Sequence, residues 1–388
     1  MDPQSSDSEE VSSDSSSESS DSRSESSDNE QQEMDNNARN NMQPQEEVRH
    51  YTSHLSFCIR FPYNRRVEVL GEGSYGKVHK ARDTNRNGTQ VAIKIFNTNK
   101  EHNRRSFKGE LEILKKIKQY RSVNNYTVTL LAYYHNEQVL NVKLSCLALT
   151  LLCESLDVEV EAKGGLPLKE IRKLGLQIAE GLEFLKRLKI IHADLTPGNI
   201  MFTNPRCKQL RIIDFGYSFE KGADIQHHIQ TAEYRAMEVF LQKMPYTNAI
   251  DIWSFGCVLA YMYTAEHLFK ARNIGFERKR KTVNQIVRTL GMPPRGMLSE
   301  TSPCENYFKK ENRRWKQNLR LWEENGRETP GSRNVAQFLD LTEEQRQSDE
   351  YLEFVELINE MLVYRVRGRI DVANILRSDF FLRPDTPE

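Results

Sequence analysis

Four polar side chains lie along the sequence in surroundings that suit phosphate chemistry. Lys94 ends an apolar run, VAIK, Asp194 and Asn199 lie five positions apart in HADLTPGN, and Asp214 follows the apolar run LRII. A carboxylate such as Asp194 can accept the proton of a hydroxyl group. The amide oxygen of Asn199 and the carboxylate of Asp214 are hard ligands of the kind that Mg²⁺ prefers. The set therefore predicts a centre that holds phosphate groups and a metal ion next to a general base.

A glycine-rich stretch, LGEGSYGKV, precedes Lys94 and contains Gly71, Gly73 and Gly76. Glycines let a backbone turn tightly and bring its N–H groups close to phosphate oxygens. Alone, the pattern is equally typical of a plain hairpin turn. Its flanks look like two strands around a turn and not like a strand that enters a helix, which disfavours a dinucleotide-binding unit.

A buried lysine needs a carboxylate to orient it, and the helical stretch SFKGELEILKKIK offers Glu110 and Glu112. At helical spacing, Glu110 shares a face with the apolar residues three, four and seven positions later, whereas Glu112 aligns with two lysines. We therefore expect Glu110 to point inward and pair with Lys94, and Glu112 to be solvated.

The charge of the chain is zero overall but unevenly distributed. Residues 1–50 carry 14 acidic and three basic side chains, and residues 1–30 contain 14 serines and no aromatic residue. Such a segment cannot bury enough apolar surface to offset chain entropy, so a disordered Ser/acidic tail is expected over 1–50, followed by a lead-in segment over 51–65. The tail could be an acidic interaction arm, a phosphorylation substrate or simply a solvated segment.

The cysteines and apolar runs indicate the compartment. Six scattered cysteines without a C-x-x-C pair suit free thiols in a reducing environment, and no secretory signal or membrane-spanning run is present. An intracellular, soluble protein of the nucleus or cytoplasm is therefore expected. The remaining sequence divides into a strand-rich part, 66–152, and a part dominated by helical periodicity, 153–382, which predicts an α+β protein with two lobes and a cleft between them.

From about residue 66 to 382, the sequence resembles the eukaryotic protein kinases. TAEYRAMEV at 231–239 looks like the end of an activation segment, and DIWSFGC at 251–257 looks like the central buried helix. HAD in place of HRD and the stretch at 290–310 point to the CMGC group. They resemble the homeodomain-interacting protein kinases most and the dual-specificity tyrosine-regulated kinases slightly less. The resemblance implies the two-lobed protein kinase fold and transfer of the ATP γ-phosphate, with Mg²⁺, to protein serine and threonine hydroxyls.

The resemblance also implies a role for each site residue. Lys94, Asp194 and Asn199 would be catalytic, Asn199 and Asp214 would hold the metal, and Glu110 would orient Lys94. Thr231 and Arg235 would belong to the segment that receives the protein substrate, with Thr231 placed against Asp194. Leu149 would be the gatekeeper before a hinge at 150–152. The expected ATP-binding residues are Leu70, Gly71, Glu72, Gly73, Ser74, Tyr75, Gly76, Lys77, Val78, Ala92, Lys94, Thr150, Leu152 and Met201.

Three further expectations are structural. Asp251 would hold the backbone of the catalytic loop, and Arg369 would pair with Glu238. Leu114, His192 and Phe215 would stack as a core spine, for which ordinary core packing is an equally good account.

Four departures from the family pattern bear on activity. Ala193 replaces an arginine that pairs with an activation-loop phosphate in many kinases, and His228 stands where this branch has its autophosphorylated tyrosine. Thr196 replaces a lysine that contacts the γ-phosphate, which predicts a slow enzyme and reopens the question of tyrosine specificity. Ala232 and Met237 replace Arg and Pro, so substrate docking is expected to differ. Thr231 favours serine/threonine specificity, and Arg235 favours a proline after the target residue.

Two alternatives stay open at this level. The first is a pseudokinase, an ATP-binding scaffold that recruits partners without efficient catalysis. The second, a nucleic-acid-binding protein, rests only on the basic body and on RKRK at 278–281. RKRK could also be a nuclear-import signal, a patch for an acidic partner or a solvated loop before the helix TVNQIVRTL. We expect protein substrates, no membrane contact and no direct binding to nucleic acid, with nuclear or transcription-related partners implied by the resemblance.

Overall fold

The computed structural model describes residues 59–60, 68–73, 76–83, 87–120, 126–139, 142–204, 208–225, 229–270, 275–298, 302–317 and 329–384. The predicted tail over 1–50, most of the lead-in segment, Ser74 with Tyr75, and His227 with His228 lie outside the described residues.

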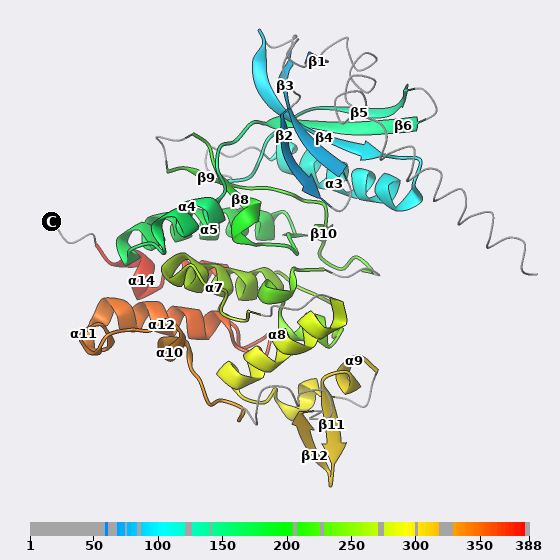
Figure 1. The fold of residues 1–388 in the computed structure, drawn as a ribbon. Helices are drawn as coiled ribbons and strands as arrows, with labels where there is room; N and C mark the ends of the chain where they lie inside the picture. The colour runs from blue at the N-terminus through cyan, green and yellow to red at the C-terminus, as the bar shows by residue number, and fades with distance from the viewer. Residues whose placement is uncertain are drawn as a thin grey trace, which may run out of the picture. The chain divides into compact units, whose positions relative to one another are not determined.

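The strand-rich part forms one antiparallel sheet (Figure 1), in the order β1-β3-β4-β6-β5 with β2 also paired to β3. Its strands are β1 (Ile59–Arg60), β2 (Val69–Gly73), β3 (Gly76–Asp83), β4 (Thr89–Asn97), β5 (Leu130–Val139) and β6 (Val142–Thr150). β4 lies between β3 and β6, and its residues 91–96 are all buried. This position explains why the run that contains Lys94 is almost wholly apolar, as strands covered on both faces usually are.

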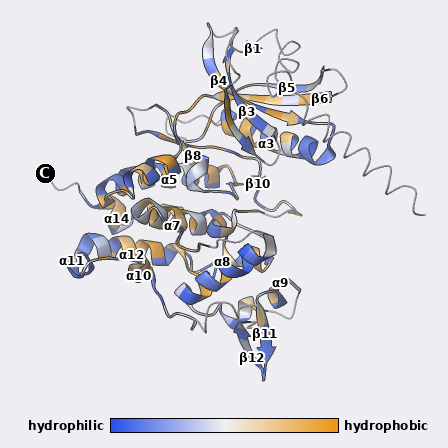
Figure 2. Cartoon of the chain, in the orientation of Figure 1, coloured by the Kyte–Doolittle hydropathy of each residue, from blue (hydrophilic) through white to orange (hydrophobic). Residues whose placement is uncertain are grey.

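Helix α3 (Glu101–Gln119) packs against β4, β5 and β6. Its apolar face repeats at three and four residues and includes Phe107, Leu114 and Ile117, all buried. The ring of Phe107 lies 5.4 Å from that of Phe96 on β4, edge to face. Figure 2 shows hydrophobic colour along β6, in keeping with this core. The packing fixes which side of α3 faces the sheet, and so where Glu110 points.

The second part is helical and is built around α5 (Leu168–Arg187), α7 (Ala249–Thr264) and α12 (Asp349–Met361). α7 is buried along most of its length, including Trp253 and Phe255. A Cβ atom on Gly256 would lie 2.9 Å from the Cβ of Met361, so glycine at this position lets α7 and α12 approach closely. The remaining helices and 3₁₀ turns are α4 (Leu156–Lys163), α6 (Met237–Phe240), α8 (Gly275–Leu290), α9 (Ser302–Glu305), α10 (Val335–Phe338), α11 (Glu343–Gln347), α13 (Val372–Ile375), α14 (Asp379–Leu382), η2 (Pro197–Asn199), η3 (Ala232–Tyr234) and η4 (Arg295–Met297).

Short strand pairs carry the loops of the site. β7 (Ile190–Ile191) pairs with β10 (Phe219–Glu220), and β8 (Ile200–Phe202) pairs with β9 (Leu210–Ile212). The predicted α+β fold class, a β-sheet unit followed by a helical unit, is confirmed. Within the described part of the chain, no helix is both long and apolar enough to cross a bilayer.

One reading of residues 278–281, a solvated loop before a helix, was wrong. They are not a loop before a helix, because α8 begins at Gly275 and includes them. Lysine and arginine are good helix formers, and Glu277 pairs with Arg280 three positions later, which supports the first turns. In Figure 2, α8 is coloured mostly as hydrophilic, but its Val283, Ile286 and Val287 are buried. Farther along, β11 (Phe308–Glu311) and β12 (Arg314–Gln317) form a hairpin.

Candidate active site

The centre of the site is a cluster of one cation and two carboxylates, in which Lys94 and Glu110 are buried and Asp214 is partly exposed. Nζ of Lys94, on β4, donates to both carboxylate oxygens of Glu110, at 3.0 and 2.8 Å, and to Oδ1 of Asp214, at 2.7 Å. Lys94 is 6% exposed and Glu110 is 2% exposed, whereas Glu112 lies on the exposed side of α3. The side chains predicted from three separate stretches of sequence therefore meet at one point.

The cluster is electrostatically coupled. Burial by itself would lower the pKa of Lys94, but the carboxylates of Glu110 and Asp214 outweigh burial and raise that pKa above its ordinary value. Burial likewise opposes ionisation of Asp214, yet the charge and hydrogen bond of Lys94 bring the pKa of Asp214 below its ordinary value. Lys94 is thus held as a cation and Asp214 as an anion, the charge states needed to bind phosphate and metal respectively.

The backbone around this cluster requires glycine at two positions. A Cβ atom on Gly76 would lie 1.9 Å from the carbonyl oxygen of Ile95, so only glycine lets β3 approach β4 this closely. A Cβ atom on Gly216 would lie 3.1 Å from Asp214 Oδ1 and 3.6 Å from Lys94 Nζ, where it would crowd the ion pair. Gly76 thus lets two strands approach closely, and Gly216 keeps space beside the Lys94–Asp214 ion pair.

The glycine-rich stretch is a strand–turn–strand unit. β2 and β3 are antiparallel, with Gly71 opposite Val78, Glu72 opposite Lys77 and Gly73 opposite Gly76. Leu70 is 42% exposed. The tip residues Ser74 and Tyr75 lie outside the described residues, so their predicted contact with phosphate stays a prediction.

The residues predicted to line an adenine pocket lie on neighbouring strands. Ala92 is opposite Leu149 in the β4–β6 pair, and Val78 is opposite Lys94 in the β3–β4 pair. Met201, on β8, bridges to the backbone of Ser155, just after the hinge.

Among the described residues, the backbone N–H of Thr150 in the hinge is hydrogen-bonded, and that of Leu152 is not. The N–H of Thr150 donates to the carbonyl of Thr129, at 3.1 Å, and so is occupied. Among the described residues, no hydrogen bond is formed by the N–H of Leu152. That donor is available for a ring nitrogen of a base.

Asp194 lies in a network that fixes its carboxylate. Oδ1 accepts from the backbone N–H of Thr231, at 2.9 Å, and from its hydroxyl, at 2.8 Å. Nδ2 of Asn199 donates to the carbonyl of Asp194, at 2.8 Å, and to Oδ2, at 3.2 Å. Because the amide nitrogen of Asn199 is turned toward Asp194, its oxygen points the other way. The chemistry of this donor set, an amide oxygen and the Asp214 carboxylate, fits Mg²⁺.

The loop that carries Asp194 is anchored from α7. Asp251 accepts hydrogen bonds from the backbone N–H groups of His192 and Ala193, each at 2.8 Å. Ala193 is fully buried and has a φ of 62°, a left-handed conformation that these bonds hold in place. The ring of His192 lies 5.1 Å from that of Phe215, edge to face. The geometry expected for Asp251 and for the His192–Phe215 contact is therefore present.

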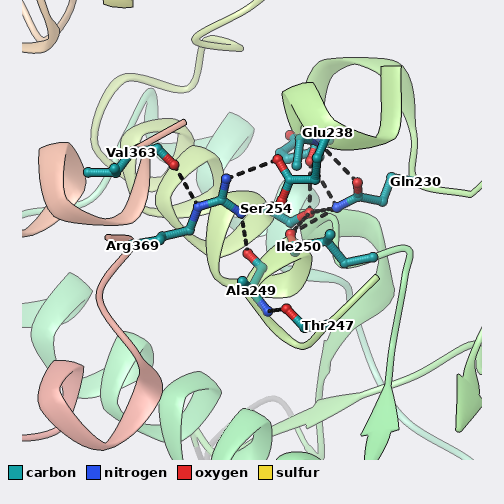
Figure 3. Close-up of polar contacts among 10 residues, drawn as sticks. Gln230, Glu238, Thr247, Ala249, Ile250, Ser254, Val363 and Arg369 are labelled. Carbon is teal, nitrogen blue, oxygen red and sulfur yellow. Dashed lines mark hydrogen bonds and ion pairs between the residues drawn. The ribbon is translucent and has the colours of Figure 1, made fainter. Parts of the chain in front are cut away.

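The segment that begins at Ile229 is bound tightly to the helical part. Gln230, for which the sequence predicted no role, donates from Nε2 to the carbonyl of Ile250, at 2.9 Å, and to Ser254 Oγ, at 2.8 Å (Figure 3). Its side-chain oxygen accepts from the N–H of Ala236. No local sequence pattern predicts this hydrogen bond, since Gln230 and Ser254 are 24 residues apart.

Arg235 and Arg369 are both buried, with different partners. Arg235 donates to the carbonyl of Gln230 from Nη2, at 2.6 Å, and to that of Ile229 from Nε, at 3.0 Å. Arg369 forms a two-pronged ion pair with Glu238, at 2.8 and 3.0 Å, and also donates to the carbonyls of Ala249 and Val363 (Figure 3). The expected Arg369–Glu238 contact is present, and Arg235 contacts backbone and not a carboxylate.

Comparison with known proteins gives a consistent picture. Residues 64–381 match the protein kinase domain. The DYRK-family kinase pom1 of Schizosaccharomyces pombe is 30% identical over 276 residues, which is 70% of this chain and 24% of that protein. The serine/threonine-protein kinase ppk5 of the same organism is 28% identical over 323 residues, covering 81% of this chain and 35% of that protein. The human dual specificity tyrosine-phosphorylation-regulated kinase 4 is 31% identical over 245 residues, covering 62% and 45% respectively.

The chain spans less than half the length of these curated relatives. The match to the protein kinase domain nevertheless covers most of the chain, and the relatives confirm the resemblance to the dual-specificity tyrosine-regulated kinases. The chain therefore belongs to the protein kinase domain family and is similar to the DYRK-family kinases within it.

Proposed function

We propose that this protein is a serine/threonine protein kinase that transfers the γ-phosphate of ATP to hydroxyl groups of protein substrates. The observation that carries the proposal is the complete polar set, in which Lys94 contacts both Glu110 and Asp214 while Asp194 contacts Thr231 and Asn199. A scaffold that bound ATP and partners without catalysis would not need the contacts that hold Asp194 against Thr231 and Asn199. No observation favours the pseudokinase alternative.

Each residue has a proposed role in this reaction. Lys94 binds phosphate oxygens, with Glu110 holding it in place, and the glycine-rich turn covers them. Leu152 offers its N–H to adenine between Ala92 and Met201. Asn199 and Asp214 would hold Mg²⁺, which when bound neutralises charge on the phosphates. Asp194 orients the acceptor hydroxyl and takes its proton.

The acceptor preference follows from the segment at 230–235. Thr231 lies against Asp194, as expected for serine or threonine acceptors. Gln230 has a φ of 60°, and its carbonyl oxygen is occupied by Arg235, so it is not offered to a substrate N–H. Proline is the residue without an N–H, so this geometry supports a preference for proline directly after the target residue. Residual tyrosine activity, a nuclear or cytoplasmic location and transcription-related partners are proposals from family resemblance.

The test is phosphate incorporation from ATP into a generic basic protein, with Mg²⁺ and with Mg²⁺ chelated. We expect incorporation only with Mg²⁺, and phosphoamino-acid analysis should find phosphoserine and phosphothreonine. Incorporation no higher than in the chelated sample would rule out the enzyme proposal, and phosphotyrosine alone would rule out the proposed acceptor class.

Replacing Thr196 with Lys should raise the rate of phosphate transfer about tenfold, because a charge-assisted hydrogen bond to the γ-phosphate contributes roughly 1.5 kcal/mol or more. Thr196 precedes η2 and lies two residues from Asp194, where a lysine could reach the same phosphate as Lys94. The Thr196→Met variant, of similar length but uncharged, is the control. If the Thr196→Met and Thr196→Lys variants transferred phosphate at the same rate, the missing charge at position 196 would not account for the slow turnover that the sequence predicts.

A further inference from the structure

Glu233 is a buried acid in the segment that faces the acceptor, and it is neutralised from another element. It lies on η3, is 4% exposed, and follows Thr231 by two positions. Arg278, on the first turns of α8, donates from Nε to Oε1 of Glu233, at 2.7 Å, and from Nη2 to Oε2, at 2.6 Å. This parallel, two-pronged geometry is the strongest form of a side-chain ion pair.

The segment 230–235 is short and internally connected, so one anchor affects the rest. The N–H of Tyr234 donates to the carbonyl of Thr231, at 3.0 Å, which links Glu233 to the residue that contacts Asp194. The Tyr234 hydroxyl is 3.0 Å from Nδ1 of His267. Gln230 attaches the segment 230–235 to α7, and the Glu233–Arg278 ion pair attaches it to α8 as well.

By the resemblance to the protein kinases, two positions that usually order this segment through phosphorylation carry other residues. Ala193 offers no cation to an activation-loop phosphate, and His228 replaces the residue that would be autophosphorylated. An ion pair between two residues of the chain needs no phosphate. Hydrogen bonding to Glu233 also raises the pKa of Arg278 above its ordinary value, so the guanidinium stays charged across physiological pH.

We propose that Arg278 is a positioning residue, which through Glu233 holds the segment 230–235 in the form that binds the acceptor, without phosphorylation. The inference rests on the proposed kinase activity. Arg278 touches neither substrate nor reacting atoms. It acts by fixing Thr231 against Asp194, so its loss affects the protein substrate and not ATP.

The test uses full-length Arg278→Gln, Arg278→Lys and the control Arg280→Gln, whose native pair with Glu277 stays within α8. We expect Arg278→Gln to lower kcat/KM for the protein substrate at least about tenfold, the effect of one lost charge-assisted hydrogen bond, with KM for ATP within about twofold. Arg278→Lys keeps the positive charge but cannot form two parallel hydrogen bonds to the Glu233 carboxylate. Its kcat/KM should therefore lie between those of Arg278→Gln and the wild type. Arg280→Gln should match the wild type.

A second measurement is independent of activity. Amide hydrogen exchange of a peptide covering 229–238 should be faster in Arg278→Gln than in the wild type, while exchange in α5 is unchanged. Unchanged kcat/KM together with unchanged exchange would overturn the inference, and so would an equal loss in Arg280→Gln. Higher turnover in Arg278→Gln would show that Arg278 blocks Glu233 from a substrate cation instead. Should the wild type itself be inactive, the proposed function fails while hydrogen exchange still decides the role of Arg278.

Discussion

Asp194→Asn should lower phosphate transfer to protein about 10²- to 10⁴-fold, the range for removal of a general base. The carboxylate is held by the N–H and hydroxyl of Thr231 on one oxygen and by Asn199 on the other. An asparagine is nearly the same shape, so it should keep part of this network while losing the ability to accept a proton. The rate is measured as phosphate incorporation at saturating ATP and Mg²⁺.

The controls separate chemistry from binding and folding. The affinity for ATP should change little, because the adenine pocket and Lys94 lie on other elements. Asp340→Asn, an exposed carboxylate outside the site, should match the wild type. A rate for Asp194→Asn equal to that of the wild type would mean that Asp194 is not the base, and that Thr231 holds it for a structural reason.

The polar set of the site could be predicted from the sequence because each member follows a local pattern. Glu110 was distinguished from Glu112 by helical periodicity alone, and the structure places one inside and the other outside. The run around Lys94 is apolar because β4 is covered on both faces. In each case, a buried position has apolar neighbours at the spacing of its helix or strand, and this spacing can be seen in the sequence.

The anchors of the acceptor segment could not be predicted in this way. Glu233 and Arg278 are 45 residues apart, and Gln230 and Ser254 are 24 apart. Their pairing depends on how α7, α8 and η3 pack, for which neither stretch carries a periodic signal. The beginning of α8 was also difficult to predict, because the four consecutive basic residues RKRK are typical of a solvated loop. In the helix, these four side chains point in different directions. Arg278 reaches a buried acid on another element, whereas Arg280 pairs with Glu277 on the same helix.

Arg369→Ala should destabilise the protein by about 3–5 kcal/mol, the cost of removing one partner from a buried ion pair. Both side chains are almost completely buried, and Arg369 forms the ion pair with Glu238, two hydrogen bonds to carbonyls and a contact with the ring of Trp253 at 5.1 Å. Without the guanidinium, Glu238 would be a buried anion with no counter-charge. Since folded domains are stable by only about 5–15 kcal/mol, the loss should be readily visible as a lower Tm.

Two comparisons determine whether the ion pair itself is responsible. Arg105→Ala removes the exposed partner of Glu101 on α3 and should cost less than about 1 kcal/mol, because surface pairs are well solvated. The double variant Arg369→Leu with Glu238→Leu should be more stable than Arg369→Ala alone, since it leaves no unpaired charge in the core. If the double variant were the less stable of the two, packing around Trp253 and not the buried charge would account for the loss. In that case, Arg369 would stabilise the helical part mainly through its apolar and ring contacts.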